Sequence, residues 1–151
     1  MDLKKLVGSG DRIALVTLPV VIVGVILNLA NPGVFGVGGP PTWLAVLSAV
    51  VLVVGLAIWI WSVVLILVNV PRGRLITEGP YAWAVHPLYT AVALLVLPWA
   101  GFLLNTWLGL LLGATLYGAS RLFAPAEEAA LARTFGSAWA AYRGGVKLGW
   151  L

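Results

Sequence analysis

The chain has 151 residues, of which 62% are hydrophobic and 9% are charged, and its formal net charge is +4. Soluble globular domains carry about 25% charged residues, so this composition excludes a soluble domain and predicts an integral membrane protein. The chain contains no cysteine, which excludes disulfides and a thiol nucleophile. Its length favours a single domain over residues 1–151. Because the basic residues are divided among clusters that flank apolar segments, we expect a membrane and no nucleic acid as the partner.

Four apolar segments that could cross a bilayer follow the short polar start at residues 1–12. The first would rise about 27 Å as a helix, close to the hydrocarbon thickness of about 30 Å, and its length argues against a cleavable signal peptide. The second is longer than a bilayer requires, so we expect its end near Val70 to protrude. The four predicted spans are residues 13–30, 43–70, 88–104 and 107–123.

Glycine and proline residues predict how the last two spans pack. Gly109 and Gly113 form a G-x-x-x-G step, which lets helix backbones approach closely. Pro87 suits the first position of the third span, and Pro98 is expected to kink that span or end it early. We therefore expect the third and fourth spans to form a packed hairpin.

The charged residues predict the orientation of the chain. All of them, nine Lys or Arg and five Asp or Glu, fall into the groups 2–12, 72–78 and 121–147. With four spans these groups lie on one side, and each is net basic, so that side and both termini should be cytoplasmic. We expect the inner or plasma membrane of a prokaryote. The tryptophans agree with this orientation. Those expected at the outer interface are Trp43, Trp99 and Trp107, and those expected near the inner interface are Trp83, Trp139 and Trp150.

A further helix is expected at about 126–142, lying at the inner interface. Pro125 suits its first position, and Gly136 weakens its middle. One apolar face should be shared by residues at spacings of three and four, namely Leu131, Phe135, Trp139 and Tyr142. The sequence thus predicts an all-α membrane helical bundle with four transmembrane helices and a C-terminal interfacial helix.

The loop between the second and third spans contains the only histidine, His86. His86 occupies the expected N-cap of the third span, where the first backbone N–H groups lack internal partners and favour an anion. The ring can add a donor there, and its charge responds near neutral pH. The alternative is an interfacial histidine that only caps a helix. Arg72 and Arg74 could likewise only extend toward lipid headgroups.

Glu127 and Glu128 open the predicted C-terminal helix. The helix dipole favours acidic residues in a first turn, and this alone could account for both. In the functional interpretation, one glutamate accepts hydrogen bonds from ribose hydroxyls or an amino group. Successive helix residues point about 100° apart, so only one of the pair should face the site. We favour Glu127, because it shares a face with Leu131 and Phe135.

Three motifs occur together in the C-terminal half: Gly79-Pro80-Tyr81, His86-Pro87-Leu88-Tyr89, and Glu127-Glu128 followed by Leu131, Phe135-Gly136 and Tyr142. With a membrane hairpin between them, they resemble the isoprenylcysteine carboxyl methyltransferase superfamily, which also includes phospholipid methyltransferases, over about residues 74–146. The chain departs from the family pattern at three places. Val85 stands where an arginine is usual, Trp139 where a tyrosine is usual, and Val146-Lys147-Leu148 where a Val-Pro-Arg-like segment is usual. Arg74 or Arg133 could supply the missing cation.

The resemblance implies methyl transfer from S-adenosylmethionine, without a metal, at the cytoplasmic membrane face. The acceptor would be lipidic or small and apolar, with a carboxylate, amine or thiol. It would enter sideways from the bilayer, between the second span and the hairpin. Trp59 and Trp61 could line that route or be ordinary lipid-facing aromatics. His86 and Glu127 would be catalytic. The cofactor would be bound by Arg74, Gly79, Tyr81, His86, Pro87, Tyr89, Glu127, Glu128 and Tyr142.

Two other functions stay open. Membrane sterol-type reductases resemble this fold, but the phosphates of NADPH would need several cations, and the loop before His86 offers only Arg72 and Arg74. A non-catalytic membrane protein that keeps the fold is the other alternative, which Val85 supports best. The glycines at 36–39 do not predict a dinucleotide-binding loop, because no strand or βαβ unit surrounds them.

Overall fold

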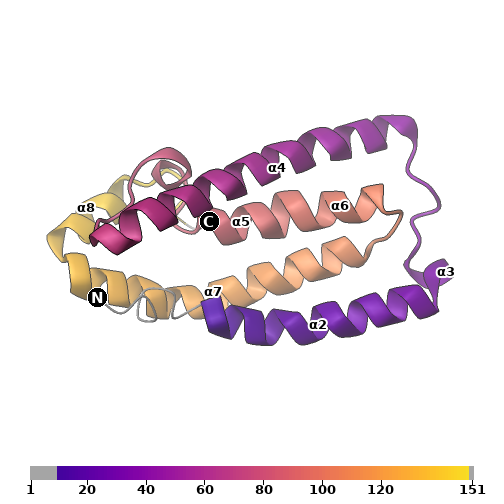
Figure 1. Ribbon diagram of the computed structural model, residues 1–151, viewed down its shortest axis with the longest axis horizontal. Helices are drawn as coiled ribbons and strands as arrows, with labels where there is room; N and C mark the ends of the chain where they lie inside the picture. The colour runs from indigo at the N-terminus through magenta and orange to yellow at the C-terminus, as the bar shows by residue number, and fades with distance from the viewer. Residues whose placement is uncertain (1–9, 150–151) are drawn as a thin grey trace.

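The computed structural model describes residues 10–149, and apart from two isolated bridges its regular structure is helical (Figure 1). The all-α prediction is therefore confirmed. Residues 1–9 and 150–151, which include Lys4, Lys5 and Trp150, lie outside the described residues. The elements are α2 (Gly10–Ala30), α3 (Pro32–Phe35), α4 (Thr42–Asn69), the 3-10 turns η1 (Val70–Arg72) and η2 (Gly79–Ala82), α5 (Pro87–Thr90), the π-helical stretch η3 (Ala91–Val96), α6 (Leu97–Leu103), α7 (Leu108–Phe135) and α8 (Ser137–Gly145).

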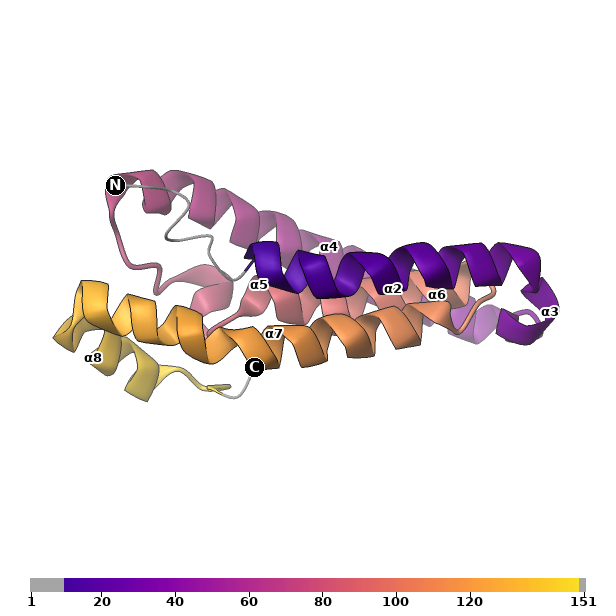
Figure 2. The ribbon, with the colours of Figure 1, turned by 90° about the horizontal axis from the view of Figure 1, so that it is seen from below.

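The long helices lie side by side in a bundle. The run α5–η3–α6, which we call the central run, lies between α4 and α7, and α2 packs against α7 (Figure 1). Figure 2 shows α2 and α7 from a second direction, again running along each other. Two apolar clusters hold the bundle: Ile13, Ala93 and Leu116 where α2, η3 and α7 meet, and Phe35 with Leu108 where α3 meets α7.

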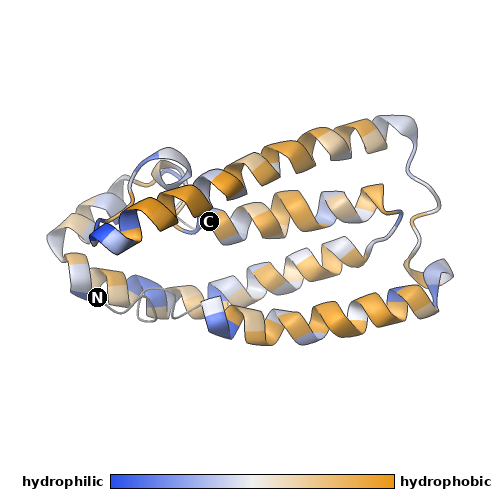
Figure 3. Cartoon of the chain, viewed as in Figure 1, coloured by the Kyte–Doolittle hydropathy of each residue, from blue (hydrophilic) through white to orange (hydrophobic). Residues whose placement is uncertain are grey.

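Large apolar side chains of α4 point outwards, whereas small residues point inwards. Ser48, Gly55 and Ser62, spaced seven residues apart, are buried, and a Cβ on Gly55 would overlap Leu95. Only 17% of the apolar window of α2 and 11% of that of α4 is buried, so neither resembles the core helix of a soluble fold. Both are long and apolar enough to cross a membrane, and Figure 3 colours both mainly as hydrophobic.

The third predicted span is a compound helix. It begins at Pro87, as expected, and Pro98 deforms it, because proline has no N–H for the α-helical hydrogen bond. Residues Ala91–Val96 adopt π-helical spacing before it, yet α6 continues to Leu103. The run Pro87–Leu103 is apolar but shorter than α2 and α4. The structure therefore shows two candidate spans by length and composition, and four spans remain our proposal.

The predicted hairpin of the third and fourth segments is confirmed. A Cβ at Gly109 would overlap the carbonyl oxygen of Leu97, and a Cβ at Gly113 would overlap the carbonyl oxygen of Ala93. Backbone therefore packs directly against backbone at both positions, which only glycine permits. This contact fixes α7 against the central run, and so fixes the residues that follow in α7.

The predicted helix break at Pro125 is wrong. α7 continues through Pro125 as one helix of 28 residues. Proline costs the helix a backbone hydrogen bond, but residues 126–132 are mostly strong helix formers, which lets the helix continue. The break falls instead at Gly136, whose φ of 52° lies in the region that favours glycine. The predicted interfacial helix at 126–142 is thus the last part of α7 together with α8.

One end of the bundle extends beyond the length that a bilayer needs. α4 and α7 each have 28 residues, about 42 Å as helices, against a hydrocarbon thickness of about 30 Å. The end of α4, the last part of α7, α8 and the loop between α4 and α5 lie together at one end (Figure 1). We call this the polar end, residues 70–86 and 121–149, and its hydrophilic colouring is visible in Figure 3.

Candidate active site

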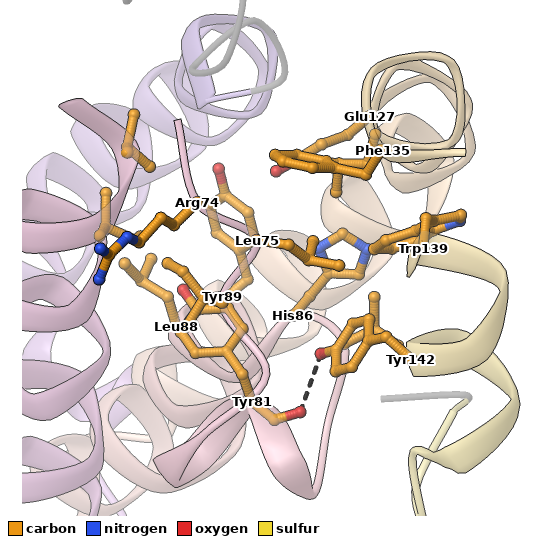
Figure 4. Close-up of a pocket in the computed structure, with 15 residues that line it drawn as sticks. Arg74, Leu75, Tyr81, His86, Leu88, Tyr89, Glu127, Phe135, Trp139 and Tyr142 are labelled. Atoms are coloured by element: carbon orange, nitrogen blue, oxygen red, sulfur yellow. Dashed lines mark hydrogen bonds between the residues drawn. The ribbon is translucent and has the colours of Figure 1, made fainter. Parts of the chain in front are cut away.

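A cavity of about 240 Å³ lies at the polar end, between the end of α4, the loop before α5 and the corner formed by α7 and α8 (Figure 4). Its lining is mostly apolar. Two segments that are distant in sequence, 74–89 and 127–142, supply most of the wall. The residues of the sequence prediction that line the cavity are Arg74, Tyr81, His86, Tyr89, Glu127 and Tyr142.

The two adjacent glutamates of α7 face different surroundings. Glu127 lines the cavity, as does Leu131 one turn later. Glu128 is not among the lining residues. Its Oε2 accepts a hydrogen bond from Nε of Arg143 at 2.9 Å, and its Oε1 lies 3.4 Å from Nε2 of His86. The structure thus turns one glutamate toward the cavity and holds the other between two side chains.

His86 occupies the N-cap position of α5 but does not act as a side-chain cap. No hydrogen bond joins its side chain to the first turn of the helix. The ring is 9% exposed and forms part of the cavity wall, with the ring centroid of Tyr89 at 6.4 Å. The single histidine is therefore buried at the cavity and is bonded to an acidic residue of another helix.

Tyr142 fastens α8 to the loop before α5. Its hydroxyl donates to the carbonyl oxygen of Tyr81 at 2.8 Å, the dashed line in Figure 4. Burial raises the pKa of Tyr142 to about 12. Burial, followed by the negative charge of Glu127, raises the pKa of Tyr81. Both phenols are protonated at neutral pH. The hydroxyl hydrogen of Tyr142 is used by the carbonyl oxygen of Tyr81, so Tyr142 can only accept from a ligand, whereas the hydroxyl of Tyr81 can donate at the cavity.

An apolar and aromatic wall continues from α7 into α8. Leu131 and Phe135 on α7, and Trp139 and Tyr142 on α8, all line the cavity. Trp139 is 7% exposed, and its ring centroid lies 5.5 Å from that of Tyr142. The predicted shared face is thus present even though the helix breaks at Gly136, because α8 turns back along the same side of the cavity.

Two predicted residues line a second cavity instead. Gly79 and Pro87 belong to an apolar cavity of about 530 Å³ between α4 and the central run. Gly79 has a φ of 60°, and a Cβ there would lie 3.0 Å from the ring of Trp61, so its role is close backbone packing. Of the two arginines considered as a replacement cation, Arg74 lines the first cavity, whereas Arg133 is exposed and is not among the lining residues.

Sequence reasoning missed Arg143. This residue lies on α8, beyond the turn at Gly136, and bonds to a glutamate fifteen positions earlier. No helical periodicity links positions across such a turn. The only signal in the sequence is a basic residue directly after Tyr142, in a helix otherwise made of small and aromatic residues.

The fold and the cavity define a class of protein: an α-helical bundle of membrane type with a mostly apolar cavity at its polar end. Residues 42–133 match the isoprenylcysteine carboxyl methyltransferase (ICMT) family. The chain belongs to this family. The matched region runs from α4 through most of α7 and contains His86, Glu127 and Glu128. No curated protein and no solved structure matches the chain.

Members of the ICMT family are membrane methyltransferases that use S-adenosylmethionine as methyl donor, so this chain is a membrane methyltransferase of that kind, and the family implies a lipidic acceptor. The residues of the cavity fit this donor chemically. Glu127 can accept hydrogen bonds from ribose hydroxyls or an amino group. Phe135 and Trp139 offer ring faces to a purine, and Arg74 offers a guanidinium to a carboxylate.

Proposed function

We propose that the cavity at the polar end binds S-adenosylmethionine and that a lipidic or small apolar acceptor reaches its methyl group at the cytoplasmic face of the membrane. One observation carries this proposal. Two segments separated by a whole membrane hairpin, 74–89 and 127–142, converge on one cavity that holds a carboxylate, an imidazole and phenols. Polar groups gathered in a mostly apolar cavity are typical of a small-molecule site.

The chain has little bond-making chemistry to perform. When bound, S-adenosylmethionine supplies a methyl group already activated by its sulfonium. The side chains therefore mainly align the reacting groups and exclude water. In this proposal Glu127 binds the cofactor, while Leu131 and Phe135 keep water out. A carboxylate acceptor needs no base, whereas an amine or thiol would pass its proton to His86 or Glu127.

The second cavity suits the apolar part of the acceptor. It lies between α4 and the central run, which is the route expected from the sequence, and Trp61 lines it while Trp59 does not. The segment before α5 separates the two cavities: Val85 and His86 line the first, and residues 82–84 line the second. An acceptor held in the second cavity would thus need to pass only this thin wall to reach the cofactor.

We also propose that the chain is one domain with four membrane spans and both termini in the cytoplasm, in the inner or plasma membrane of a prokaryote. The charged groups support this orientation, because Arg72–Glu78 and Arg121–Lys147 lie at the same end of the bundle. Single cysteines introduced at Gly38 and Arg74 should react with an impermeant thiol reagent from opposite sides of the membrane. Labelling of both from the same side would contradict four spans.

Calorimetric titration of the purified protein tests the function directly. S-adenosylmethionine should bind, and NADPH should not, because the first cavity holds one arginine rather than several cations. Incubation with a lipid extract and radiolabelled methyl donor, followed by chromatography, should yield a labelled lipidic product. Binding of NADPH alone would favour the reductase alternative, and binding of neither would contradict the proposal.

A further inference from the structure

Three side chains form a continuous chain of contacts from the surface of α8 to the wall of the cavity. Nε of Arg143 donates to Oε2 of Glu128 at 2.9 Å, and Oε1 of Glu128 lies 3.4 Å from Nε2 of His86. The three residues belong to α8, α7 and the position before α5. Their side chains are 36%, 23% and 9% exposed in that order. The charged pair is thus nearer the solvent, and the histidine is at the cavity.

The chemistry of these groups fixes where the hydrogens lie. A guanidinium only donates hydrogen bonds, and a carboxylate paired with it only accepts them. The hydrogen between Glu128 and His86 therefore belongs to Nε2 of the imidazole. In the neutral ring the other nitrogen, Nδ1, then has no hydrogen and is an acceptor. Within residues 10–149, the hydrogen bond of the His86 ring is made through Nε2, which leaves Nδ1 for a ligand.

We propose that Glu128 and Arg143 are positioning residues that fix His86 as the Nε2–H tautomer and present Nδ1 to the cavity as a hydrogen-bond acceptor or base. The proposal rests on the assignment of this cavity as the methyl donor's site. It gives Glu128 a role that acts through His86 rather than by contact with the cofactor. It also adds Arg143, which lies beyond the residues that match the family.

The C-terminal tail supports a fixed position for Arg143. A Cβ on Gly149 would overlap the guanidinium of Arg143, so the tail packs closely against it. The N–H of Leu148 donates to the carbonyl oxygen of Trp83 at 2.8 Å, and the Lys147 ammonium lies 4.3 Å from the ring centroid of Trp83. The guanidinium therefore lies between Glu128 and a tail that is itself hydrogen-bonded to the loop before His86.

The tautomer can be measured directly, because His86 is the only histidine in the chain. Labelling with ¹⁵N-histidine gives one imidazole spectrum, recorded without ligand at about pH 8, where an ordinary histidine is neutral. The wild type should show a protonated Nε2 and an unprotonated Nδ1. Glu128→Ala and Arg143→Met should each shift the ring toward a mixture of both tautomers.

Matched controls remove the same charges from exposed positions of the polar end. Glu78→Ala and Arg72→Met should leave the imidazole spectrum unchanged, since neither residue lines the cavity. If Arg143→Met does not fold, Arg143→Lys carries the test, because lysine keeps the charge but lacks the Nε–H that reaches Glu128. It should show a smaller change in the same direction, and an unchanged spectrum would overturn the proposal.

Titration with S-adenosylmethionine separates this proposal from the proposed function. Glu128→Ala and Arg143→Met should each raise the Kd about three- to tenfold, and should have no further effect when His86 is already alanine. If both variants change the His86 tautomer but the wild type does not bind S-adenosylmethionine, the assignment of the cavity fails and the positioning role stands. If the wild type binds but the imidazole spectrum of His86 is the same in both variants as in the wild type, Glu128 and Arg143 only join α7 to α8, and the proposal is overturned.

Discussion

The two ends of the bundle are both rich in hydrogen-bonding groups, but they use them differently. At what we call the closed end, residues 28–41 and 101–109, polar side chains bind one another. Thr106 donates to Asn28 at 2.7 Å and accepts from the N–H of Leu108 at 3.1 Å. At the polar end, Glu127 and His86 line a cavity. The polar groups of the closed end thus join helices to one another, whereas Glu127 and His86 at the polar end face a cavity.

Further contacts at the closed end join α3 to the start of α7. Trp107 stacks on Phe35 with ring centroids 4.9 Å apart, and its Nε1–H donates to the carbonyl oxygen of Val34 at 2.9 Å. The N–H of Gly39 donates to Oδ1 of Asn105 at 2.7 Å. Each of these bonds joins residues more than sixty positions apart, so they fix α3 and the loop after it to the hairpin.

The difference follows from the distribution of charge. The closed end contains no charged residue, so its polar groups are neutral and bind one another in pairs such as Thr106 with Asn28. The polar end holds carboxylates and guanidinium groups, whose charge-assisted bonds suit a charged ligand. Substitutions at the polar end should therefore change cofactor affinity, and substitutions at the closed end should change the free energy of unfolding.

The largest expected effect is on cofactor affinity. Glu127→Gln removes a charge-assisted hydrogen bond worth about 1.5–3 kcal/mol, which corresponds to about a tenfold to hundredfold rise in Kd for S-adenosylmethionine. Glu78→Gln, at an exposed position outside the cavity, should leave the Kd unchanged. Calorimetry on both variants checks this. Equal affinity of Glu127→Gln and wild type would contradict a role for Glu127 in binding the cofactor.

Backbone packing near the closed end should dominate stability. Gly109→Ala forces a Cβ against the Leu97 carbonyl oxygen and should lower the free energy of unfolding by about 1–3 kcal/mol. Gly118→Ala, on the same helix but with open space around it, should raise it by up to about 1 kcal/mol. Unfolding in detergent micelles measures both. If both alanines shift stability in the same direction, the direct backbone contact is not what holds the hairpin.

Local patterns in the sequence were enough to predict the main helical segments and several residues of the cavity wall. The G-x-x-x-G step predicted the hairpin, because close helix packing requires small residues on one face. The spacing of Leu131 and Phe135 indicated the apolar face beside Glu127. These features depend on neighbours within one or two turns, which periodicity can detect.

Features that depend on tertiary contacts escaped prediction. Pro125 is tolerated within α7 because strong helix formers follow it and because α7 is packed against the central run, which no local rule for proline includes. The link from Glu128 to Arg143 crosses a turn that only the positive φ of Gly136 creates. The position of Gly79 against Trp61 likewise requires α4 and the loop to be placed first.

A buried hydroxyl at the closed end should matter for stability and not for binding. Thr106→Val leaves Asn28 and the N–H of Leu108 without their partner, which should cost about 1–2 kcal/mol of unfolding free energy. Thr115→Val is the matched control, because that hydroxyl bonds only to a carbonyl of its own helix and is exposed, so the change should stay within about 0.5 kcal/mol. Affinity for S-adenosylmethionine should be unchanged in both, and a weakened affinity in Thr106→Val would show that the two ends are coupled.

The smallest effect should come from Tyr142, and it should depend on pH. Tyr142→Phe removes the hydrogen bond to the Tyr81 carbonyl oxygen and should lower the free energy of unfolding by about 0.5–1.5 kcal/mol near neutral pH. The folded pKa of Tyr142 is raised to about 12 from an ordinary value of 10.0, so the folded state keeps its proton longer than the unfolded state. The contribution of Tyr142 is therefore fully present below pH 10 and is lost as the pH rises toward 12.

The difference in stability between wild type and Tyr142→Phe should be constant from about pH 7 to about pH 9.5 and should narrow above it, as measured by unfolding at each pH. A difference that stays constant up to about pH 11.5 would mean that Tyr142 titrates alike in both states, and that its hydroxyl does not hold α8 to the loop.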